Sequence, residues 1–342
     1  MRTFYDNWLQ MWDQAAAEKK AARKSIHEDE LEWVSTPQDR RVALLIAPET
    51  GFRTWGTASM LAEIPVGWHT GKHKHGEEAI HFVEGEGFSV VNGKRYDWKT
   101  GSTMAIPFGV EHQHFNTGST TARYYALLSP HLEHFVGIHR TTQLEECGET
   151  GSVPDVPASA NGLDDEGRRI VLHYADAPVR RGAEGEKPPV LDPNKPMILG
   201  DTEGMAKMAA HHKSEYVDFM STRKEMNDFK VFEQEFSGIL TDSPREYGGT
   251  HAHMEAILYI LDGEGYTIAD GEKIPWRKGS SLHIQGPQTV HQHVNESDVP
   301  SRMLRAAPGI RYFFERMAKN EFPYLYISMR QAVVEGSKAG AS

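Results

Sequence analysis

Two stretches of the 342-residue chain repeat each other at a fixed offset. Sliding residues 71–116 along the chain by 178 positions places His73 and His75 on His251 and His253, and Gly85-Glu86-Gly87 on Gly263-Glu264-Gly265. After one extra residue in the second stretch, His112-Gln113-His114-Phe115-Asn116 matches His291-Gln292-His293-Val294-Asn295. A period of this length is too long for a solenoid. The repeat therefore predicts two copies of one domain.

Each copy has the pattern of short β-strands joined by turns. Residues 79–83 and 257–261 are apolar runs that stop at the Gly-Glu-Gly sequences, and Asn92-Gly93 and Asp270-Gly271 follow a few residues later. Such dipeptides favour the two positive-φ positions of a type I′ hairpin. Closely spaced strands and turns are typical of a sandwich or a barrel. We therefore predict an all-β fold, with Trp98 and Trp276 packed in its cores or hairpins.

The flanking segments divide the chain into five parts. Residues 1–50 are expected to form a partly helical N-terminal arm, because Phe4, Trp8 and Trp12 recur at helical spacing. Residues 51–147 and 229–310 contain the two repeats. Residues 148–228 are expected to be a linker, rich in Pro, Gly and Asp at first and helical from 203 to 228. Residues 311–342 form a C-terminal segment.

Composition excludes several classes of protein. The 37 Lys and Arg against 48 Asp and Glu give a net charge of −11, which disfavours nucleic acid as a partner. The apolar runs fall far short of the ~20 residues of a membrane span. Asp6 and Asp13 argue against a secretory signal, and Cys147 is the single cysteine, so a cytoplasmic location is expected. The aromatic face of the N-terminal arm is expected to be buried against another copy, in a homodimer or homotetramer.

The 18 histidines indicate metal binding. In a strand, side chains at i and i+2 project from the same face, so His73 and His75 project together, as do His251 and His253. Each copy supplies a third histidine some way further on, His112 or His291. This duplicated triad predicts a metal site in each copy.

The same residues resemble the two motifs of the cupin superfamily. Gly67-x5-His73-Lys-His75-x2-Glu78-x6-Gly85 is similar to the first motif, and Gly101-x5-Pro107-x-Gly109-x2-His112-x3-Asn116 is similar to the second. The second copy departs at Ala256, which stands where Glu78 would be, and at Gln285-Gly286-Pro287. The resemblance implies a bicupin, with two cupin β-barrels (double-stranded β-helices), an N-terminal helical arm and a helical linker.

Within cupins, the His-x-His-x-Asn block and the strand ending Val83-Glu-Gly-Glu-Gly87 are similar to those of gentisate and 1-hydroxy-2-naphthoate dioxygenases. This likeness implies Fe(II) held by three histidines, with Mn(II), Ni(II) or Zn(II) as alternatives, and an extradiol-type ring cleavage. The expected partners are O₂ and a small aromatic acid that is gentisate-like, salicylate-like or hydroxynaphthoate-like. Three neutral imidazoles would leave three positions open on an octahedral metal, enough for a chelating hydroxy-carboxylate and O₂.

Five further residues are candidates for the site. Glu78 has two possible roles, because many cupins use a glutamate near this position as a fourth ligand, whereas ring-cleaving members usually lack it. Its gap from His75 is one residue shorter than usual, so it could miss the metal and act as a base or hydrogen-bond acceptor. His114 and His293 lie on the ligand face and are candidates for acid–base catalysis. Arg123 and Arg305 follow the ligand blocks and are candidates for a carboxylate clamp.

Three other functions remain open. A Mn-dependent decarboxylase or oxidase of a small dicarboxylate usually keeps a glutamate ligand in both barrels, against which Ala256 argues. A flavonol-type dioxygenase would differ from the first prediction only in its pocket. A non-catalytic ligand-binding or storage bicupin has commonly lost its ligand histidines, whereas all six positions are histidine here.

Overall fold

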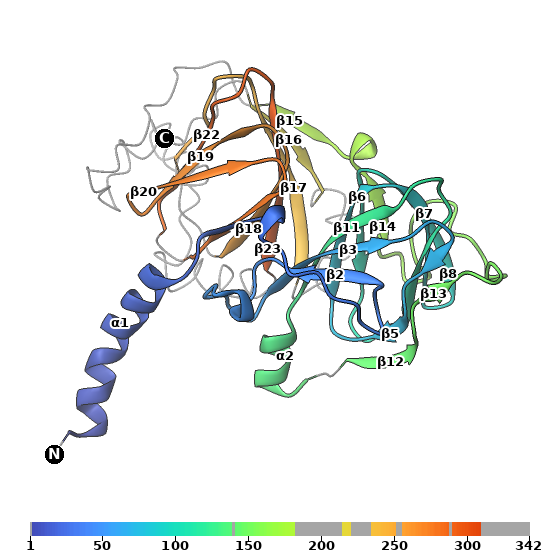
Figure 1. The fold of residues 1–342 in the computed structure, drawn as a ribbon, viewed down its shortest axis with the longest axis horizontal. Helices are drawn as coiled ribbons and strands as arrows, with labels where there is room; N and C mark the ends of the chain where they lie inside the picture. The colour runs from blue at the N-terminus through green and yellow to red at the C-terminus, as the bar shows by residue number, and fades with distance from the viewer. Residues whose placement is uncertain are drawn as a thin grey trace, which may run out of the picture.

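Two β-barrels lie beside each other, and one helix projects from the body (Figure 1). The computed structural model describes residues 2–138, 141–181, 214–219, 234–250, 255–286 and 289–308. In this part of the chain the fold is a mostly β bicupin with few helices, as the sequence predicts. No helix in the described ranges is long and apolar enough to cross a membrane.

The first barrel is built from two sheets. One has the strand order β14-β9-β6-β11-β3-β2, and the other has the order β12-β5-β10-β4-β13, with β7 paired to β10 and β8 paired to β7. The strands are β2 (Arg41–Leu44), β3 (Ala58–Ile64), β4 (Trp68–His69), β5 (Lys72–Lys74), β6 (Glu78–Glu84), β7 (Glu86–Val91), β8 (Lys94–Lys99), β9 (Ser102–Ile106), β10 (His112–Asn116), β11 (Ala122–Leu128), β12 (Thr142–Glu145), β13 (Gly148–Glu149) and β14 (Val171–His173).

The second barrel also has two sheets, of order β1-β21-β18-β23-β17-β16-β15 and β20-β19-β22. Its strands are β1 (Ser25–His27), β15 (Val179–Arg181), β16 (Ser214–Asp218), β17 (Gln234–Asp242), β18 (Ala256–Asp262), β19 (Glu264–Ala269), β20 (Glu272–Arg277), β21 (Ser280–Ile284), β22 (His291–Asn295) and β23 (Ser301–Pro308). The short helices are α2 (Pro130–Val136), η1 (Glu28–Glu30), η2 (Pro48–Thr50) and η3 (Tyr174–Asp176).

Residues at equivalent positions of the two sequence repeats pair with equivalent partners in their sheets. Glu78 lies opposite Ile106 where β6 pairs with β9, and Ala256 lies opposite Ile284 where β18 pairs with β21. The Gly-Glu-Gly turns also have the same backbone conformation in both copies. Gly85 has a φ of +92° and Gly263 a φ of +89°, a region that only glycine adopts readily. The two copies of the sequence therefore fold in the same way.

The described residues form three apolar cores. One fills each barrel, and the third lies between them and contains residues of both, including Tyr125 of β11 and Tyr259 of β18. The rings of these two tyrosines are stacked at 4.6 Å, and the Tyr125 hydroxyl lies 2.9 Å from the Ser281 hydroxyl. Because the side chains of a strand alternate between faces, one sheet of each barrel contributes both to its own interior and to this shared core.

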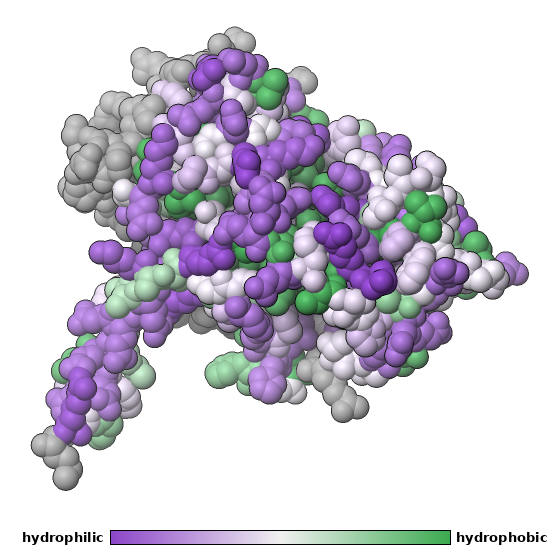
Figure 2. Space-filling model, viewed as in Figure 1, coloured by the Kyte–Doolittle hydropathy of each residue, from purple (hydrophilic) through white to green (hydrophobic). Residues whose placement is uncertain are grey.

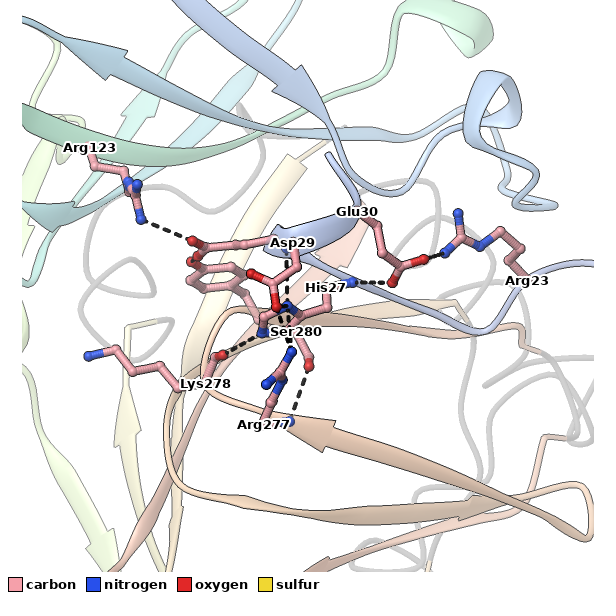
Figure 3. A network of polar contacts seen from close by, with 10 residues as sticks. Arg23, His27, Asp29, Glu30, Arg123, Arg277, Lys278 and Ser280 are labelled. Carbon is pink, nitrogen blue, oxygen red and sulfur yellow. Dashed lines mark hydrogen bonds and ion pairs between the residues drawn. The ribbon is translucent and has the colours of Figure 1, made fainter. Parts of the chain in front are cut away.

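The N-terminal segment after residue 24 belongs to both barrels. Strand β1 pairs with β21 of the second barrel, whereas β2 pairs with β3 of the first. Between these strands, Glu28 forms an ion pair with Arg123 of β11 at 3.0 Å and accepts a hydrogen bond from the Tyr259 hydroxyl. Figure 3 shows this polar network, in which Asp29 pairs with Arg277 of the second barrel and Arg123 of the first barrel reaches the same segment.

Helix α1 (Phe4–Ala21) confirms the predicted helical arm. Its N-terminus is capped by Thr3, whose hydroxyl accepts from the Asp6 amide while its own amide donates to the Asp6 carboxylate. No residue of the helix is buried, and Trp8 and Trp12 are 60% and 74% exposed. Figure 2 shows apolar patches on this projecting helix, a surface of the kind that proteins normally cover.

The linker departs from the expectation. Residues 214–218, within the range predicted to be helical, form strand β16, which pairs with β17. The helix prediction is wrong there, because Tyr216 packs against the core of the second barrel and Val217 against the core between the barrels, an alternation that a strand provides. The rest of 203–228, apart from residue 219, lies outside the described residues. Strands β13 and β14 attach the earlier linker to β4 and β9 of the first barrel.

Candidate metal centre

Four predicted site residues come together inside the first barrel. His73 lies on β5 directly opposite His112 on β10, and their ring centroids are 4.2 Å apart. His75 follows β5, with its ring 4.9 Å from that of His73 and 4.8 Å from that of His112. Glu78 begins β6 and completes the group, whose possible ligand atoms all lie within 4.8 Å of one another. The four side chains are buried, with exposures of 3% or less.

The three histidines share one tautomer. Their Nδ1 atoms lie 2.9, 3.0 and 3.0 Å from the carbonyl oxygens of Gly71, Gly76 and Val110, in the order His73, His75 and His112. A carbonyl oxygen only accepts, so each Nδ1 must donate. A neutral imidazole then carries a lone pair on Nε2, and all three Nε2 atoms are buried without a hydrogen-bond partner in the described structure. This is the orientation that metal-ligating histidines require.

The Glu78 carboxylate faces these lone pairs. One of its oxygens lies 3.5 Å from Nε2 of His75 and 3.3 Å from Nε2 of His112, and neither carboxylate oxygen has a hydrogen bond within the described ranges. Lone pairs facing a carboxylate repel one another unless a cation lies between them. The donor set therefore fits a divalent metal ion, and the chain is a metal-binding bicupin with a buried site of three histidines and one glutamate.

The pKa shifts of His73 and Glu78 agree with ligation, whereas the pKa of His75 is raised because the Glu78 carboxylate outweighs the effect of burial. Burial, together with the neighbouring rings of His112 and His75, lowers the pKa of His73 to about 2. Burial alone would raise the pKa of Glu78, but the contacts with His112 and His75 hold it well below its usual range. Neutral imidazole and ionised carboxylate are the forms that bind metals without first losing a proton.

Of the two roles left open for Glu78, the structure favours the fourth ligand over a free base. Gly76 lies at a bend between His75 and Glu78, and a Cβ there would collide with the Glu133 carboxylate. Beyond this bend Glu78 lies beside His75 at the start of β6. Four protein donors replace the three that the resemblance implies.

The second barrel differs at this position. His291 is fully buried, and its Nδ1 lies 2.9 Å from the Thr289 carbonyl oxygen, as His112 does with Val110. His251 and His253 lie outside the described residues. Ala256 packs into the apolar core where the first barrel has Glu78. The neighbouring Glu255 instead contacts Nε2 of His283 at 2.6 Å. Its carboxylate also accepts a hydrogen bond from the Trp55 amide at 3.1 Å.

His114 and His293 are buried inside their barrels on the ligand face of β10 and β22. Burial lowers the pKa of His114 to about 3, so its imidazole is neutral. Its ring centroid is 5.7 Å from that of His112. His293 lies in the same way beside His291, at 5.4 Å. Both candidates thus stand next to a predicted ligand.

The two candidate arginines have different surroundings. Arg123 lies between the barrels, where it pairs with Glu63 at 2.7 Å and Glu28 at 3.0 Å, so its charge is already matched there. Arg305 lies on β23 opposite Leu258, a residue of the second barrel's core, and paired residues share a sheet face. Its half-buried side chain is therefore on the interior face of the second barrel.

Sequence reasoning missed a polar pair inside the first barrel. The Tyr124 hydroxyl donates to the Asp39 carboxylate at 2.6 Å, and both side chains are buried. Burial raises the pKa of Asp39 to about 7. The Tyr124 ring lies 5.7 Å from that of His114. Asp39 precedes β2 and lies outside both cupin motifs, so no spacing in the sequence connects it to this site.

Comparison with known proteins agrees with the fold. A family model described as cupin domain matches residues 60–128 and 238–306, one segment in each barrel, so the chain has two cupin domains. An uncharacterised protein of Methanocaldococcus jannaschii is 39% identical over 54 residues, which cover 16% of this chain and 42% of that protein. The chain thus matches less than half the length of that relative.

Among solved structures, two mutants of Bacillus subtilis oxalate decarboxylase, a deletion variant and a substitution variant, are similar to this chain. Each has a TM-score of 0.59 and 12% sequence identity, and each match covers 83% of this chain. The match covers 76% of the deletion variant's chain and 77% of the substitution variant's chain. At this identity the likeness concerns the fold alone. It extends over both barrels and supports the bicupin architecture.

Proposed function

We propose that the first barrel is the active site of an Fe(II)-dependent dioxygenase that cleaves the ring of a hydroxylated aromatic carboxylic acid. The observation that carries this proposal is a buried donor set of three histidines and Glu78 beside an aromatic interior. Ring cleavage and the identity of the metal rest on the sequence resemblance together with this arrangement.

The core next to the donor set is packed with aromatic rings. From His112 the contacts run to His114, and from there to Tyr124 at 5.7 Å and Phe82 at 6.3 Å. Phe82 stacks on Trp98 at 3.8 Å. Aromatic side chains beside the donor set favour an aromatic substrate, because offset and edge-to-face ring contacts stabilise it beyond the burial of its area. A small dicarboxylate would gain little from them.

Four protein donors change how a substrate would bind. Two positions would remain for a substrate oxygen and for O₂ on an octahedral metal held by this set. We therefore expect the substrate to be held through one oxygen and not as the chelate that a three-histidine site would allow. One carboxylate among three neutral imidazoles leaves the site with net positive charge once a divalent ion is bound, which attracts an anionic substrate. The buried side chains exclude bulk water.

The two barrels are not equivalent in this proposal. At the position of Glu78 the second barrel has Ala256, and at the position of Tyr124 it has Met303, which pairs with Ile260 as Tyr124 pairs with Phe82. At these two positions the first barrel has groups able to ligate a metal or to move a proton, and the second barrel has apolar side chains. We therefore assign turnover to the first barrel.

A second candidate is a Mn-dependent oxidase or decarboxylase of a small dicarboxylate. It is favoured by the presence of Glu78 in the donor set, because a carboxylate ligand is what the three-histidine ring cleavers usually lack. The Bacillus subtilis structures named above are of a decarboxylase that acts on oxalate. The absence of a carboxylate at Ala256 argues against it.

An oxygen electrode separates these candidates. The protein is loaded with Fe(II) or with Mn(II) and given gentisate, salicylate or 1-hydroxy-2-naphthoate on one side and oxalate on the other, with CO₂ measured in parallel. We expect one O₂ consumed per ring opened with iron and an aromatic acid. Carbon dioxide release from oxalate with manganese, and no uptake with any aromatic acid, would instead support the second candidate.

Two variants test the assignment to the first barrel. His112→Ala should abolish O₂ uptake, because it removes one of four donors from the proposed active site. His291→Ala is the matched change in the second barrel, and it should leave uptake largely intact. Uptake lost only with His291→Ala would move the active site to the second barrel.

A further inference from the structure

One hydrogen-bonded chain occurs in both barrels at equivalent positions. In the first, the Trp98 indole donates to the Ser89 hydroxyl at 3.0 Å, and this oxygen lies 2.6 Å from Nδ1 of His114. In the second, the Trp276 indole donates to Thr267 at 3.1 Å, and Thr267 Oγ1 lies 2.8 Å from Nδ1 of His293. The residue type changes from serine to threonine, but the hydroxyl is retained.

The strand register holds these groups in place. His114 lies directly opposite Ser89, and His293 directly opposite Thr267. Each tryptophan lies opposite a glycine, Gly87 or Gly265, where a Cβ would collide with the indole ring. The second glycine of each Gly-Glu-Gly turn therefore makes room for the ring whose N–H begins the chain.

The direction of the protons follows from the donor types. An indole N–H only donates, so it occupies one lone pair of the hydroxyl oxygen, and the proton of that hydroxyl is directed to an acceptor. His Nδ1 is the nearest acceptor in both barrels. Ser89 also lies 3.3 Å from the Met104 sulfur, which is a weak acceptor. In the second barrel Leu282 takes the place of Met104 and offers no acceptor, yet the chain is the same.

We propose that His114 is held as the Nε2–H tautomer and donates a hydrogen bond to the anion that binds at the metal of the first barrel. The ligand histidines have the opposite tautomer, with Nδ1 donating to backbone carbonyls and Nε2 facing the metal. The two histidines of His112-Gln113-His114 thus have complementary roles: the first offers a lone pair, the second an N–H.

The placement of the ring supports this role. Side chains two residues apart on β10 share the interior face, and the rings of His112 and His114 are 5.7 Å apart. Nδ1 of His114 is directed sideways to β7, so the Nε2 edge faces away from Ser89, into the barrel. The inference rests on the metal centre of the proposed function but on neither ring cleavage nor a particular substrate.

Azide is a suitable probe, because it binds open metal positions without turnover. We would load the His291→Ala protein with Co(II), so that the visible spectrum reports the first barrel, and titrate azide. Loss of a hydrogen bond to a charged ligand should weaken azide binding about 10-fold or more in Ser89→Ala and His114→Phe, with cobalt content unchanged. Ser89→Thr should restore wild-type affinity, since the second barrel uses threonine at this position.

Nitrogen-15 NMR of ring-labelled histidine in the zinc-loaded protein gives a second readout. The His114 signals, identified by their loss in His114→Phe, should show Nε2 protonated and Nδ1 unprotonated in the wild type. Trp98→Phe keeps the hydroxyl and should retain this tautomer more fully than Ser89→Ala. An Nδ1–H tautomer in the wild type, or unchanged azide affinity in Ser89→Ala, would overturn the proposal. Failure of ring cleavage would change neither readout.

Discussion

Replacing Glu78 by glutamine should destabilise the protein without metal and, more strongly, with metal. In the metal-free protein the carboxylate is 1% exposed and lies 3.5 Å from Nε2 of His75 and 3.3 Å from Nε2 of His112, contacts that hold its pKa well below its usual range against the effect of burial. In the loaded protein the same carboxylate is a ligand. Glutamine keeps the shape of the side chain and removes the charge, so both states should lose an interaction and the response to metal should weaken.

The size of each effect can be worked out. Losing the contacts of this buried charge with the two histidines should destabilise the metal-free protein by about 1–3 kcal/mol, and each kcal/mol corresponds to roughly 2–4 °C in Tm. With metal at 100 times its Kd, the wild type gains about 2.7 kcal/mol from binding. Loss of one of four donors should weaken the metal by at least about 100-fold. The same metal concentration then contributes only about 0.4 kcal/mol.

Thermal unfolding of chelator-treated and metal-titrated protein measures both effects. Glu84→Gln, at the exposed end of the same strand, is the matched control and should change neither stability by more than about 0.5 kcal/mol. A metal-free Glu78→Gln protein that melts above the metal-free wild type would refute the reasoning, because it would show that the two histidines do not stabilise the carboxylate. So would an undiminished metal-induced shift.

Three further predictions follow from the described contacts. Burial raises the pKa of Asp39 from 3.8 to about 7, so between these pH values the native state keeps a proton that the unfolded chain releases. The free energy of unfolding should therefore fall as pH rises through this window. Asp39→Asn should flatten that fall in denaturant titrations at several pH values. His283→Ala removes one of the groups that contact the buried carboxylate of Glu255, another being the Trp55 amide, and should cost about 1–3 kcal/mol in urea unfolding. Replacing the exposed Trp8 and Trp12 by serine should leave Tm unchanged but abolish the expected self-association in light scattering, and an unchanged oligomer would contradict a role for helix α1.

Much of the fold could be predicted from the sequence because it is repeated and because β-structure has a local period. The fixed offset between the two copies indicated two barrels. The equivalent residue pairs in the strands of each barrel confirm that the copies fold alike. Alternation along a strand was enough to place His73 and His75 on one face. The helix of the N-terminal arm followed equally from the spacing of its aromatic residues. Each of these patterns lies within a single helix or strand, or is repeated between the two copies of the domain.

The helix expected in the linker shows where such patterns fail. Residues 214–218 have no strong period of their own, and they form a strand because β17 offers a free edge and each face of β16 meets a different core. The surroundings of Arg123 were equally out of reach of the sequence pattern. Its neighbours in the sequence do not show that Glu28 and Glu63 reach it from other strands and match its charge.

The sequence by itself determined that two cupin barrels would form and which three histidines of the first would converge. Only the tertiary structure decided that Glu78 joins them, that Asp39 meets Tyr124, and that a hydroxyl on β7 directs the ring of His114. The physical reason is the range of the interactions. A strand's side-chain period is set by its own backbone, whereas a donor set, an ion pair and a proton's direction depend on which distant strands and loops the barrel brings within hydrogen-bonding distance.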